Sequence, residues 1–259
     1  MSIVAVDIGN SRMKFGWFDA PLQPDSNDPH ALPHPRSVIA LPTGEGNGAA
    51  LERWSAEIPR STPWWIACVN RPAAARLMSW LDGRSVARQL THRDLPITAA
   101  VEHPDRVGID RLAGAVAANR LREKERPAIV IGVGTAITVD LITADGIFRG
   151  GAILPGIAMS ARALDEFTDL LPRSPLDELT IAPPALGTST LSAIHSGLYW
   201  GAIGAMRELF AKLSEHVSPS TVKPNLYLTG GAAASVAAQL DPAAQYLEYL
   251  VLAGIALAK

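Results

Sequence analysis

The chain has 259 residues, of which 48% are hydrophobic, and its formal net charge is −2. That length and apolar content suffice for one large domain or two ordinary ones, and the small negative charge gives no general attraction to nucleic acid or to an anionic membrane. The one cysteine, Cys68, excludes an internal disulfide framework and fits a reducing compartment. The longest apolar run, at 250–258, falls far short of the ~20 residues of a membrane span, and the N-terminus lacks a signal-peptide pattern. We therefore expect a soluble, cytoplasmic protein.

The first elements of the chain are predicted to be two strands joined by a short turn. The apolar runs "SIVAVDI" (2–8) and "MKFGWF" (13–18) flank residues 9–12, which we call the first turn. Five prolines with Asp, Asn and Ser predict a surface loop at 20–37. The next predicted elements are a helix at 47–58, a strand at 64–69, a helix from Pro72 to about Leu81, a strand at 85–90 and a loop-like stretch at 91–107.

The remainder of the chain also alternates strands with helices. Apolar residues at helical spacing predict a helix at 108–122. The further predicted elements are two strands within 128–142, a strand at 147–156, helices at 157–171 and 189–215, and a strand, a glycine turn and a helix within 225–240. This alternation indicates an α/β fold.

Two stretches of the chain share one plan. "VDIGNSRMKFGWF" (6–18) and "IGVGTAITVDLI" (131–142) each read as an apolar strand, a turn with glycine and a small polar residue, and a second apolar strand. Equivalent units in two halves suggest a duplicated fold with a cleft between two lobes. We place the lobes at 1–118 and 119–259.

The first turn carries residues suited to a metal–nucleotide complex. Gly9 lets the backbone approach a ligand closely, and successive N–H groups in such a turn form a concavity for an anion. Ser11 adds a hydroxyl donor and Lys14 a mobile cation that can reach a phosphate oxygen. Asp7 would repel bare phosphate, so its carboxylate makes sense if it holds Mg²⁺, directly or through water.

The alternative interpretation of the first turn is an ordinary β-hairpin. In that case Asp7 caps the turn and Lys14 is solvated, and short glycine motifs alone do not decide between the two. The chain has no Walker-type G-x-x-x-x-G-K-[ST] motif, so any nucleotide site is of another kind.

Two later turns are candidates for the same nucleotide. Gly132, Gly134 and Thr135 repeat the pattern of the first turn. Gly230 and Gly231 could let a flat nucleoside lie on the backbone, or could simply make a tight turn from strand to helix.

These three elements, in this order, resemble the superfamily of acetate and sugar kinases, heat-shock chaperone ATPases and actin. Proteins of that superfamily bind ATP in a cleft between two related lobes. A further motif, "RVGIDRLAGAVAA" (106–118), narrows the resemblance to type III pantothenate kinases, which include the related Bvg accessory factor proteins. The stretches "DIGNSRMKFG", "GIDR", "GTAITVD", "GGAILPGI", "GTSTLSAIHSG" and "LTGG" stand in the family's order over nearly the whole chain.

The resemblance implies a role for each matching residue. For the ATP phosphates and their Mg²⁺ it implies Asp7, Ile8, Gly9, Asn10, Ser11, Arg12, Met13 and Lys14, with a further ATP contact at Thr135. For pantothenate it implies Gly108, Ile109, Asp110, Arg111 and Thr190, with Asp110 as the catalytic proton acceptor. The family is dimeric, which implies a homodimer with Thr190 near its interface.

Three positions depart from the family's pattern. Ser11 stands where threonine is common, and it keeps the hydroxyl. Gly132 stands where an aspartate often holds a monovalent cation, so a K⁺ or NH₄⁺ site lacks its usual carboxylate. Val101 stands where a tyrosine often lies near the substrate, so the pantothenate contacts are expected to differ.

The expected reaction is ATP-dependent phosphorylation of pantothenate to 4′-phosphopantothenate, the first step of coenzyme A biosynthesis. In such a transfer the protein mainly positions the reactants and stabilises charge, and Asp110 would orient the hydroxyl and accept its proton. Two alternatives stay open: an accessory or regulatory protein on the same fold with little kinase activity, and a kinase for another small hydroxy acid. We expect no nucleic-acid or membrane partner.

Overall fold

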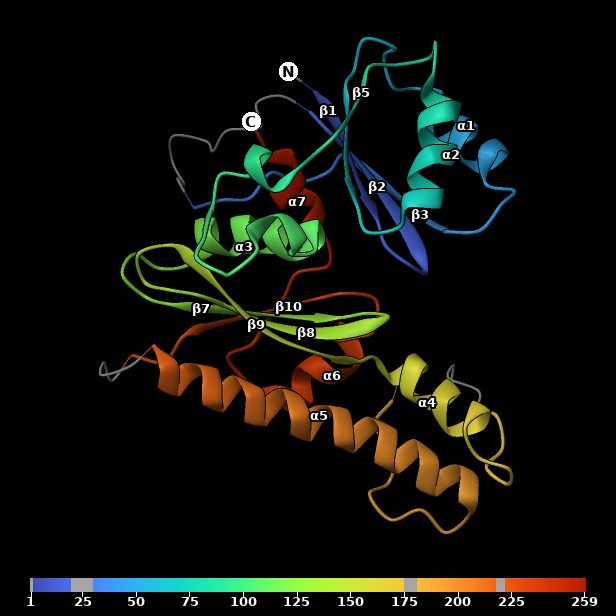
Figure 1. Ribbon diagram of the computed structural model, residues 1–259, viewed down its shortest axis with the longest axis vertical. Coiled ribbons are helices and arrows are strands. Elements are labelled where there is room, and N and C mark those ends of the chain that lie inside the picture. The colour runs from blue at the N-terminus through green and yellow to red at the C-terminus, as the bar shows by residue number, and fades with distance from the viewer. Residues whose placement is uncertain (1, 20–29, 175–180, 218–221) are drawn as a thin grey trace. The chain divides into compact units, whose positions relative to one another are not determined.

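The computed structural model describes residues 2–19, 30–174, 181–217 and 222–259 (Figure 1). Residues 20–29 of the predicted proline-rich loop lie outside these ranges. The chain forms two compact units: the first comprises Met1–Arg122, Gly146–Phe148 and Tyr249–Lys259, and the second Glu123–Asp145 and Arg149–Glu248. Among the helices of the described residues, none combines the length and the apolar character of a membrane span.

The first unit contains a five-stranded sheet. Its strand order is β3-β2-β1-β4-β5, with β1 antiparallel to β2 and parallel to β4. The strands are β1 (Ile3–Ile8), β2 (Arg12–Phe18), β3 (Ser37–Pro42), β4 (Trp64–Cys68) and β5 (Ala87–Gln89). The predicted strands at both sides of the first turn are therefore confirmed, whereas β3 was not predicted.

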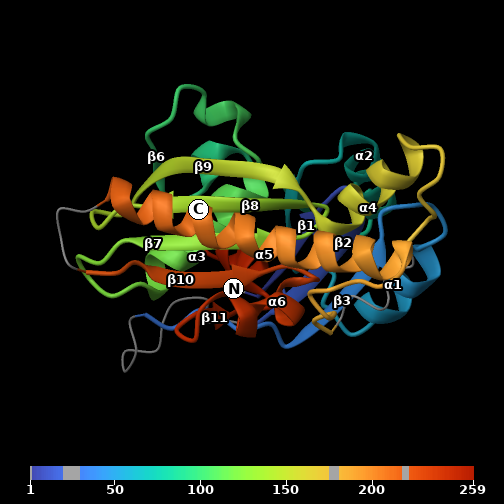
Figure 2. The ribbon, with the colours of Figure 1, turned by 90° about the horizontal axis from the view of Figure 1, so that it is seen from below.

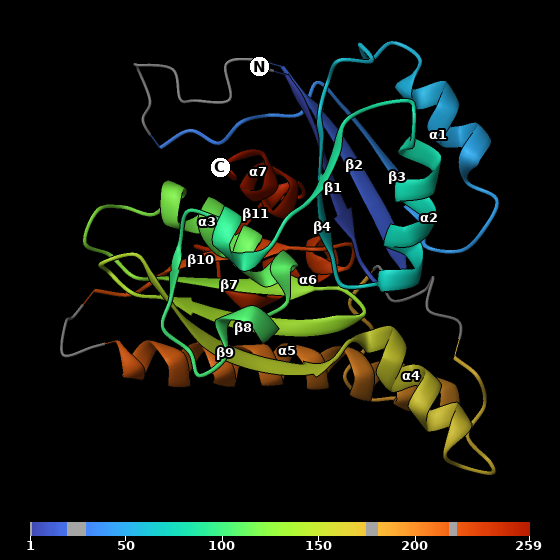
Figure 3. The same cartoon turned by 45° about the horizontal axis from the view of Figure 1, so that its top comes forward.

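Helices cover the two faces of the first sheet. Val6 and Phe15 point to the face that packs under α1 (Gly48–Ser55) and α2 (Arg71–Leu81), where Trp54, Trp64 and Trp80 complete an aromatic core. Because strand side chains alternate, Asp7 belongs to the opposite face. Figure 3 shows α1 and α2 on one side of this sheet and α7 (Leu250–Ala256) on the other.

Helix α3 (Ile109–Leu121) packs closely on α7 within the first unit. A Cβ atom at Gly254 of α7 would lie only 1.8 Å from the carbonyl oxygen of Ala113, so the close approach of the two helices requires glycine. The apolar run at 250–258, too short for a membrane span, is thus used to pack α3 against the first sheet.

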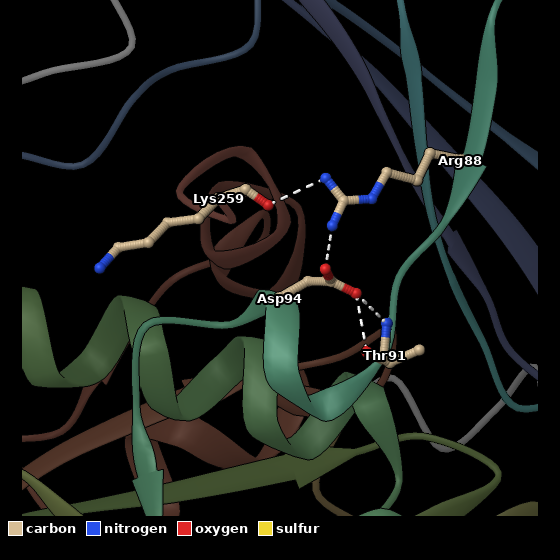
Figure 4. Close-up of polar contacts among 4 residues, drawn as sticks. All are labelled: Arg88, Thr91, Asp94 and Lys259. Atoms are coloured by element: carbon tan, nitrogen blue, oxygen red, sulfur yellow. Dashed lines mark hydrogen bonds and ion pairs between the residues drawn. The ribbon is translucent and has the colours of Figure 1, made fainter.

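The chain after α7 is tied to the edge of the first sheet (Figure 4). The backbone N–H of Lys259 donates to the carbonyl oxygen of Asp94 at 2.8 Å, and Arg88 donates to the carbonyl oxygen of Lys259 at 3.0 Å. Arg88 also pairs with the Asp94 carboxylate, which accepts from the N–H and the hydroxyl of Thr91 at 2.6 and 2.8 Å. We call these four residues the Arg88 clamp.

The second unit is built on a sheet of order β11-β10-β7-β8-β9. Helix α5 (Thr190–His216) lies across one face, as Figure 2 shows, and packs Tyr199, Ile203 and Met206 against Ile131 of β7. The strands are β7 (Ala128–Val133), β8 (Ala136–Ile142), β9 (Ile147–Pro155), β10 (Asn225–Thr229) and β11 (Gln245–Tyr246); the other helices are α4 (Ile157–Glu166) and α6 (Ala233–Leu240).

Two predicted elements differ from the structure. The predicted helix at 157–171 ends at Glu166, and the predicted loop at 91–107 contains short regular elements. These are the 3₁₀ helices η1 (His92–Asp94) and η2 (Pro104–Arg106) and the two-residue strand β6 (Thr98–Ala99), which pairs with residues 147–148 at the start of β9.

Candidate active site

The first turn places a carboxylate and an amine on one face of the first sheet. Asp7 of β1 and Lys14 of β2 are directly opposite in the antiparallel register. Residues opposite each other on neighbouring strands point to the same face, so the two side chains share the face that α3 and α7 cover. Both side chains are partly buried.

The turn itself is closed tightly and faces solvent. The N–H of Gly9 donates to the carbonyl oxygen of Arg12 at 3.0 Å, and a Cβ atom at Gly9 would lie 3.1 Å from that oxygen. Asn10, Ser11 and Arg12 are exposed. A small residue at position 9 and an exposed backbone fit the expected approach of a phosphate group.

Asp7 has an unusual acidity. Its pKa is raised to about 7, first by burial and then by the carboxylate of Asp110, while Lys14 opposes both effects. The interaction with Asp110 means that the end of β1 and the start of α3, far apart in the sequence, come together in the first unit. The predicted phosphate and substrate motifs therefore lie near each other in this unit.

The "GIDR" motif forms the N-terminal end of helix α3. Gly108 is the N-terminal flanking residue, and a Cβ atom there would lie 2.6 Å from Oδ1 of Asp110. The N–H of Arg111 donates to the same oxygen at 2.9 Å. Burial raises the pKa of Asp110, while the Arg111 N–H and guanidinium oppose the increase.

The remaining residues of the motif support this turn. Ile109 is buried in the core of the first unit. The guanidinium carbon of Arg111 lies 5.8 Å from the ring centre of Phe148. The motif thus presents Asp110 and Arg111 as its two partly exposed charged groups.

Glycines from three separate stretches meet at one end of the second sheet. The turn between β7 and β8 contains Gly134 and Thr135, and the N–H of Gly156 donates to the carbonyl oxygen of Thr135 at 3.0 Å. A Cβ atom at Gly156 would lie 2.2 Å from the carbonyl oxygen of Gly134. Gly230, with φ of +109°, would place a Cβ atom 2.3 Å from the carbonyl oxygen of Val133. Bare backbone is therefore required where these strands end.

Two predicted positions of the second unit have simpler surroundings. Gly132 pairs with Thr138, and a Cβ atom at Gly132 would lie 2.9 Å from the Thr138 hydroxyl. Thr190 is the exposed first residue of α5, whose N-terminus is capped by Ser189 and Ser192. Within the described ranges, no group of three or more His, Cys, Asp and Glu side chains is arranged to hold a metal ion.

Sequence reasoning missed one residue that touches the first turn. Thr43, directly after β3, donates to two carbonyl oxygens of this turn. No sequence pattern marks it, because its contacts are with backbone atoms rather than with side chains.

Comparison with known proteins supports the resemblance seen in the motifs. A family model described as type III pantothenate kinase matches residues 3–212. The chain is 34% identical to the type III pantothenate kinase of Alkalilimnicola ehrlichii, over 97% of this chain and 95% of the relative.

Solved structures support the fold. A Campylobacter jejuni protein described as a Baf family transcriptional activator matches with a TM-score of 0.58 at 19% identity, over 98% of this chain and 95% of that one. A Listeria monocytogenes protein described as an N-acetylmannosamine kinase matches with a TM-score of 0.50 at 14% identity, over 99% and 97%. The expected α/β fold of the actin-like ATPases is thus confirmed, and the chain belongs to the type III pantothenate kinase family.

Proposed function

We propose that the first turn and the start of α3 align ATP and pantothenate for phosphoryl transfer. The reaction of the family is ATP-dependent phosphorylation of pantothenate to 4′-phosphopantothenate, the first step of coenzyme A biosynthesis. The observation that carries the proposal is the electrostatic interaction between Asp7 and Asp110 within the first unit. A reaction of this kind fits the cytoplasmic location that we expect.

Asp110 is proposed to receive the proton of the pantothenate hydroxyl. One of its oxygens is held by the Arg111 N–H at 2.9 Å, which fixes the direction of the carboxylate. The raised pKa makes Asp110 a better base than an exposed aspartate. Arg111 offers a planar, permanently charged group suited to the carboxylate of pantothenate, and we assign Gly108, Ile109 and Thr190 to the same substrate.

Residues 7–14 are proposed to bind the ATP phosphates, with Asp7 toward Mg²⁺. Burial and then the Asp110 carboxylate raise the pKa of Asp7, so a nearby cation would stabilise its ionised form, and Asp7 fits a magnesium ligand. Mg²⁺ bound there would neutralise charge that develops on the phosphates. Lys14 supplies a second positive charge from the facing strand. In the second unit, we assign an ATP contact to Thr135, beside the glycines that open the backbone.

We propose that K⁺ or NH₄⁺ does not act through position 132. Glycine has no carboxylate, and the space beside it is filled by the hydroxyl of Thr138. Initial rates in matched K⁺ and Na⁺ buffers test this, and a strong dependence abolished by Thr138→Val would contradict it.

We propose a homodimer formed through an apolar surface of the second unit. Six large apolar side chains, from Ile153 of β9 to the stretch before α5, are exposed: Ile153, Met159, Phe167, Leu170, Ile181 and Leu186. Large exposed apolar patches mark protein interfaces, and Thr190 follows this stretch closely.

We also propose that residues 1–118 and 119–259 are the two duplicated lobes. The β1-turn-β2 and β7-turn-β8 units support this, since each contains an antiparallel pair whose first strand also pairs in parallel with another strand. Helix α7 would then cross back from the second lobe to cover the first sheet.

The direct test supplies ATP, Mg²⁺ and pantothenate to the purified chain and measures 4′-phosphopantothenate by mass spectrometry. We expect product from the wild type and a strong decrease with Lys14→Ala. A panel of other small hydroxy acids separates a different acceptor from pantothenate. Nucleotide binding without turnover of any acceptor would instead support the accessory-protein alternative, to which the departures at Val101 and Gly132 point.

A further inference from the structure

We propose that Thr43 is a positioning residue for the first turn and that Arg76 and Asn47 hold Thr43 in place. The proposal rests on the proposed binding of ATP phosphates by residues 7–14. It concerns residues at the end of β3, directly before α1 and in the middle of α2, all of which lie outside the family motifs.

Thr43 makes two hydrogen bonds to the first turn. Its backbone N–H donates to the carbonyl oxygen of Ser11 at 3.1 Å, and its hydroxyl donates to the carbonyl oxygen of Gly9 at 3.2 Å. The residue is only 7% exposed although its side chain is polar. A buried hydroxyl requires a hydrogen-bond partner, and here the partner is the backbone of the turn.

These two bonds fix the direction of the turn's amide groups. In a trans peptide the C=O and the following N–H point in opposite directions. Because the carbonyls of Gly9 and Ser11 are directed at Thr43, the N–H groups of Asn10 and Arg12 point away from it. Backbone N–H groups are the donors that a phosphate-binding turn uses, so Thr43 sets the orientation on which phosphate binding depends.

Thr43 is itself fixed from two sides. The Arg76 guanidinium of α2 donates to the Thr43 carbonyl oxygen at 2.7 Å. The side-chain amide of Asn47, which precedes α1, donates to the carbonyl oxygens of Pro42 and of Gly44 at 2.5 and 3.1 Å, on both sides of Thr43. All of these hydrogen bonds around Thr43 are accepted by backbone carbonyl oxygens. They therefore hold the backbone conformation without a bound ligand.

A merely structural role would lower stability and weaken the binding of both substrates alike. The test therefore compares the binding of ATP with that of adenosine and of pantothenate. The variants are Thr43→Val, which removes the hydroxyl at similar volume, Thr43→Ser, which keeps it, and Arg76→Met. Thr62→Val is the matched control, a buried threonine remote from the turn in sequence. Arg84→Met is the control arginine, since Arg84 also donates to a carbonyl oxygen, that of Trp80 at 2.8 Å.

The readouts are the KM for ATP, the KM for pantothenate, and the Kd of ATP and of adenosine, measured well below the thermal midpoint of each variant. We expect Thr43→Val to raise the KM and the Kd for ATP about tenfold. The Kd of adenosine and the KM for pantothenate should change by less than about twofold. Thr43→Ser and both controls should match the wild type. Arg76→Met should weaken ATP about threefold, and the double variant should be no worse than Thr43→Val, because the two side chains act in series.

Lys14→Ala tells failure of this proposal from failure of the phosphate assignment. If Lys14→Ala weakens ATP binding and Thr43→Val has the same ATP affinity as Thr62→Val, Thr43 is not a positioning residue although the turn binds phosphates. If neither Lys14→Ala nor Thr43→Val weakens ATP relative to adenosine, the assignment of the turn and the role of Thr43 are both wrong. Should Thr43→Val fold poorly, equal ATP affinity of Arg76→Met and Arg84→Met would overturn the proposal.

Discussion

The carboxylate of Asp110, at the start of α3, adds to the increase that burial causes in the pKa of Asp7 at the end of β1. Two acids that must be ionised at the same time repel each other, so the site stores unfavourable charge unless a cation or a proton is present. A kinase that binds a magnesium–nucleotide complex has a use for such a pair. The arrangement predicts that, without bound ligand, the wild type is less stable than a variant in which Asp7 is replaced by an uncharged residue.

Asp7→Asn should stabilise the protein at neutral pH while it weakens ATP-dependent turnover. The pKa of Asp7 is raised from 3.8 to about 7, so the folded state binds a proton more tightly than the unfolded state. Its contribution to stability is therefore complete below pH 3.8 and is lost as the pH rises through 7.

As the pH rises from 4 to 8, the free energy of unfolding of Asp7→Asn should increase by ~1–2 kcal/mol relative to the wild type. This is less than the free energy equivalent to the whole pKa shift, because Asp7 is partly exposed. Urea unfolding without Mg²⁺ or nucleotide measures it, with the exposed Asp105→Asn as control. A difference that does not change with pH would contradict the assigned cause.

The Arg88 clamp should show the opposite pH dependence. The N–H of Thr91 and then its hydroxyl and Arg88 hold the pKa of Asp94 below 3.8, so Asp94 contributes stability above that pH and the contribution is lost as the pH falls through the lowered pKa. Asp94→Asn should destabilise the first unit by ~1 kcal/mol at pH 7 and much less at pH 3. Denaturant titrations at the two pH values measure the difference. An equal effect at both would indicate that the charge is irrelevant.

Gly254→Ala should be strongly destabilising. The added Cβ atom would lie 1.8 Å from the Ala113 carbonyl oxygen, so α7 must move away from α3. We expect a loss of ~3 kcal/mol or more in the free energy of unfolding. Gly204→Ala is the matched control, since Gly204 lies inside α5 with nothing within 4 Å of the added atom, and it should stabilise by ~0.5–1 kcal/mol. Similar stabilities of the two variants would refute the close approach of α3 and α7.

Aspartate substitutions among the six exposed apolar side chains of the second unit should dissociate the proposed dimer. Phe167 and Leu170 are 79% and 86% exposed, so aspartate at either position disturbs no core of the second unit. We expect Phe167→Asp and Leu170→Asp to shift the mass measured by light scattering from dimer to monomer. Val86→Asp, at a 70% exposed apolar residue of the first unit, should leave the dimer intact. A dimer that persists in both variants would place the interface elsewhere.

The sequence predicted much of the fold because its strongest patterns are local. The strand–turn–strand units, the helix at 108–122 and the order of the glycine turns follow from periodicity and motifs, and the structure confirms these elements. Strand β3 escaped prediction since only one of its six residues is buried and the strand follows a proline-rich stretch.

Long-range relationships could not be predicted in the same way. Nothing in the spacing of Asp7 and Asp110 says that the end of β1 meets the start of α3. The roles of Gly156 and Gly254 depend on backbone atoms of distant segments, and the contacts of Thr43 end on carbonyls that every residue carries. Such features become visible only when the chain is folded.

The central claim is that Asp110 accepts the proton of the pantothenate hydroxyl, and the rate of phosphopantothenate formation by Asp110→Asn at saturating ATP and pantothenate tests it most directly. The account predicts a decrease in kcat of ~10²–10⁴-fold, with the thermal midpoint and ATP affinity retained and with Asp105→Asn near the wild-type rate. Near wild-type turnover by a folded Asp110→Asn variant would contradict it.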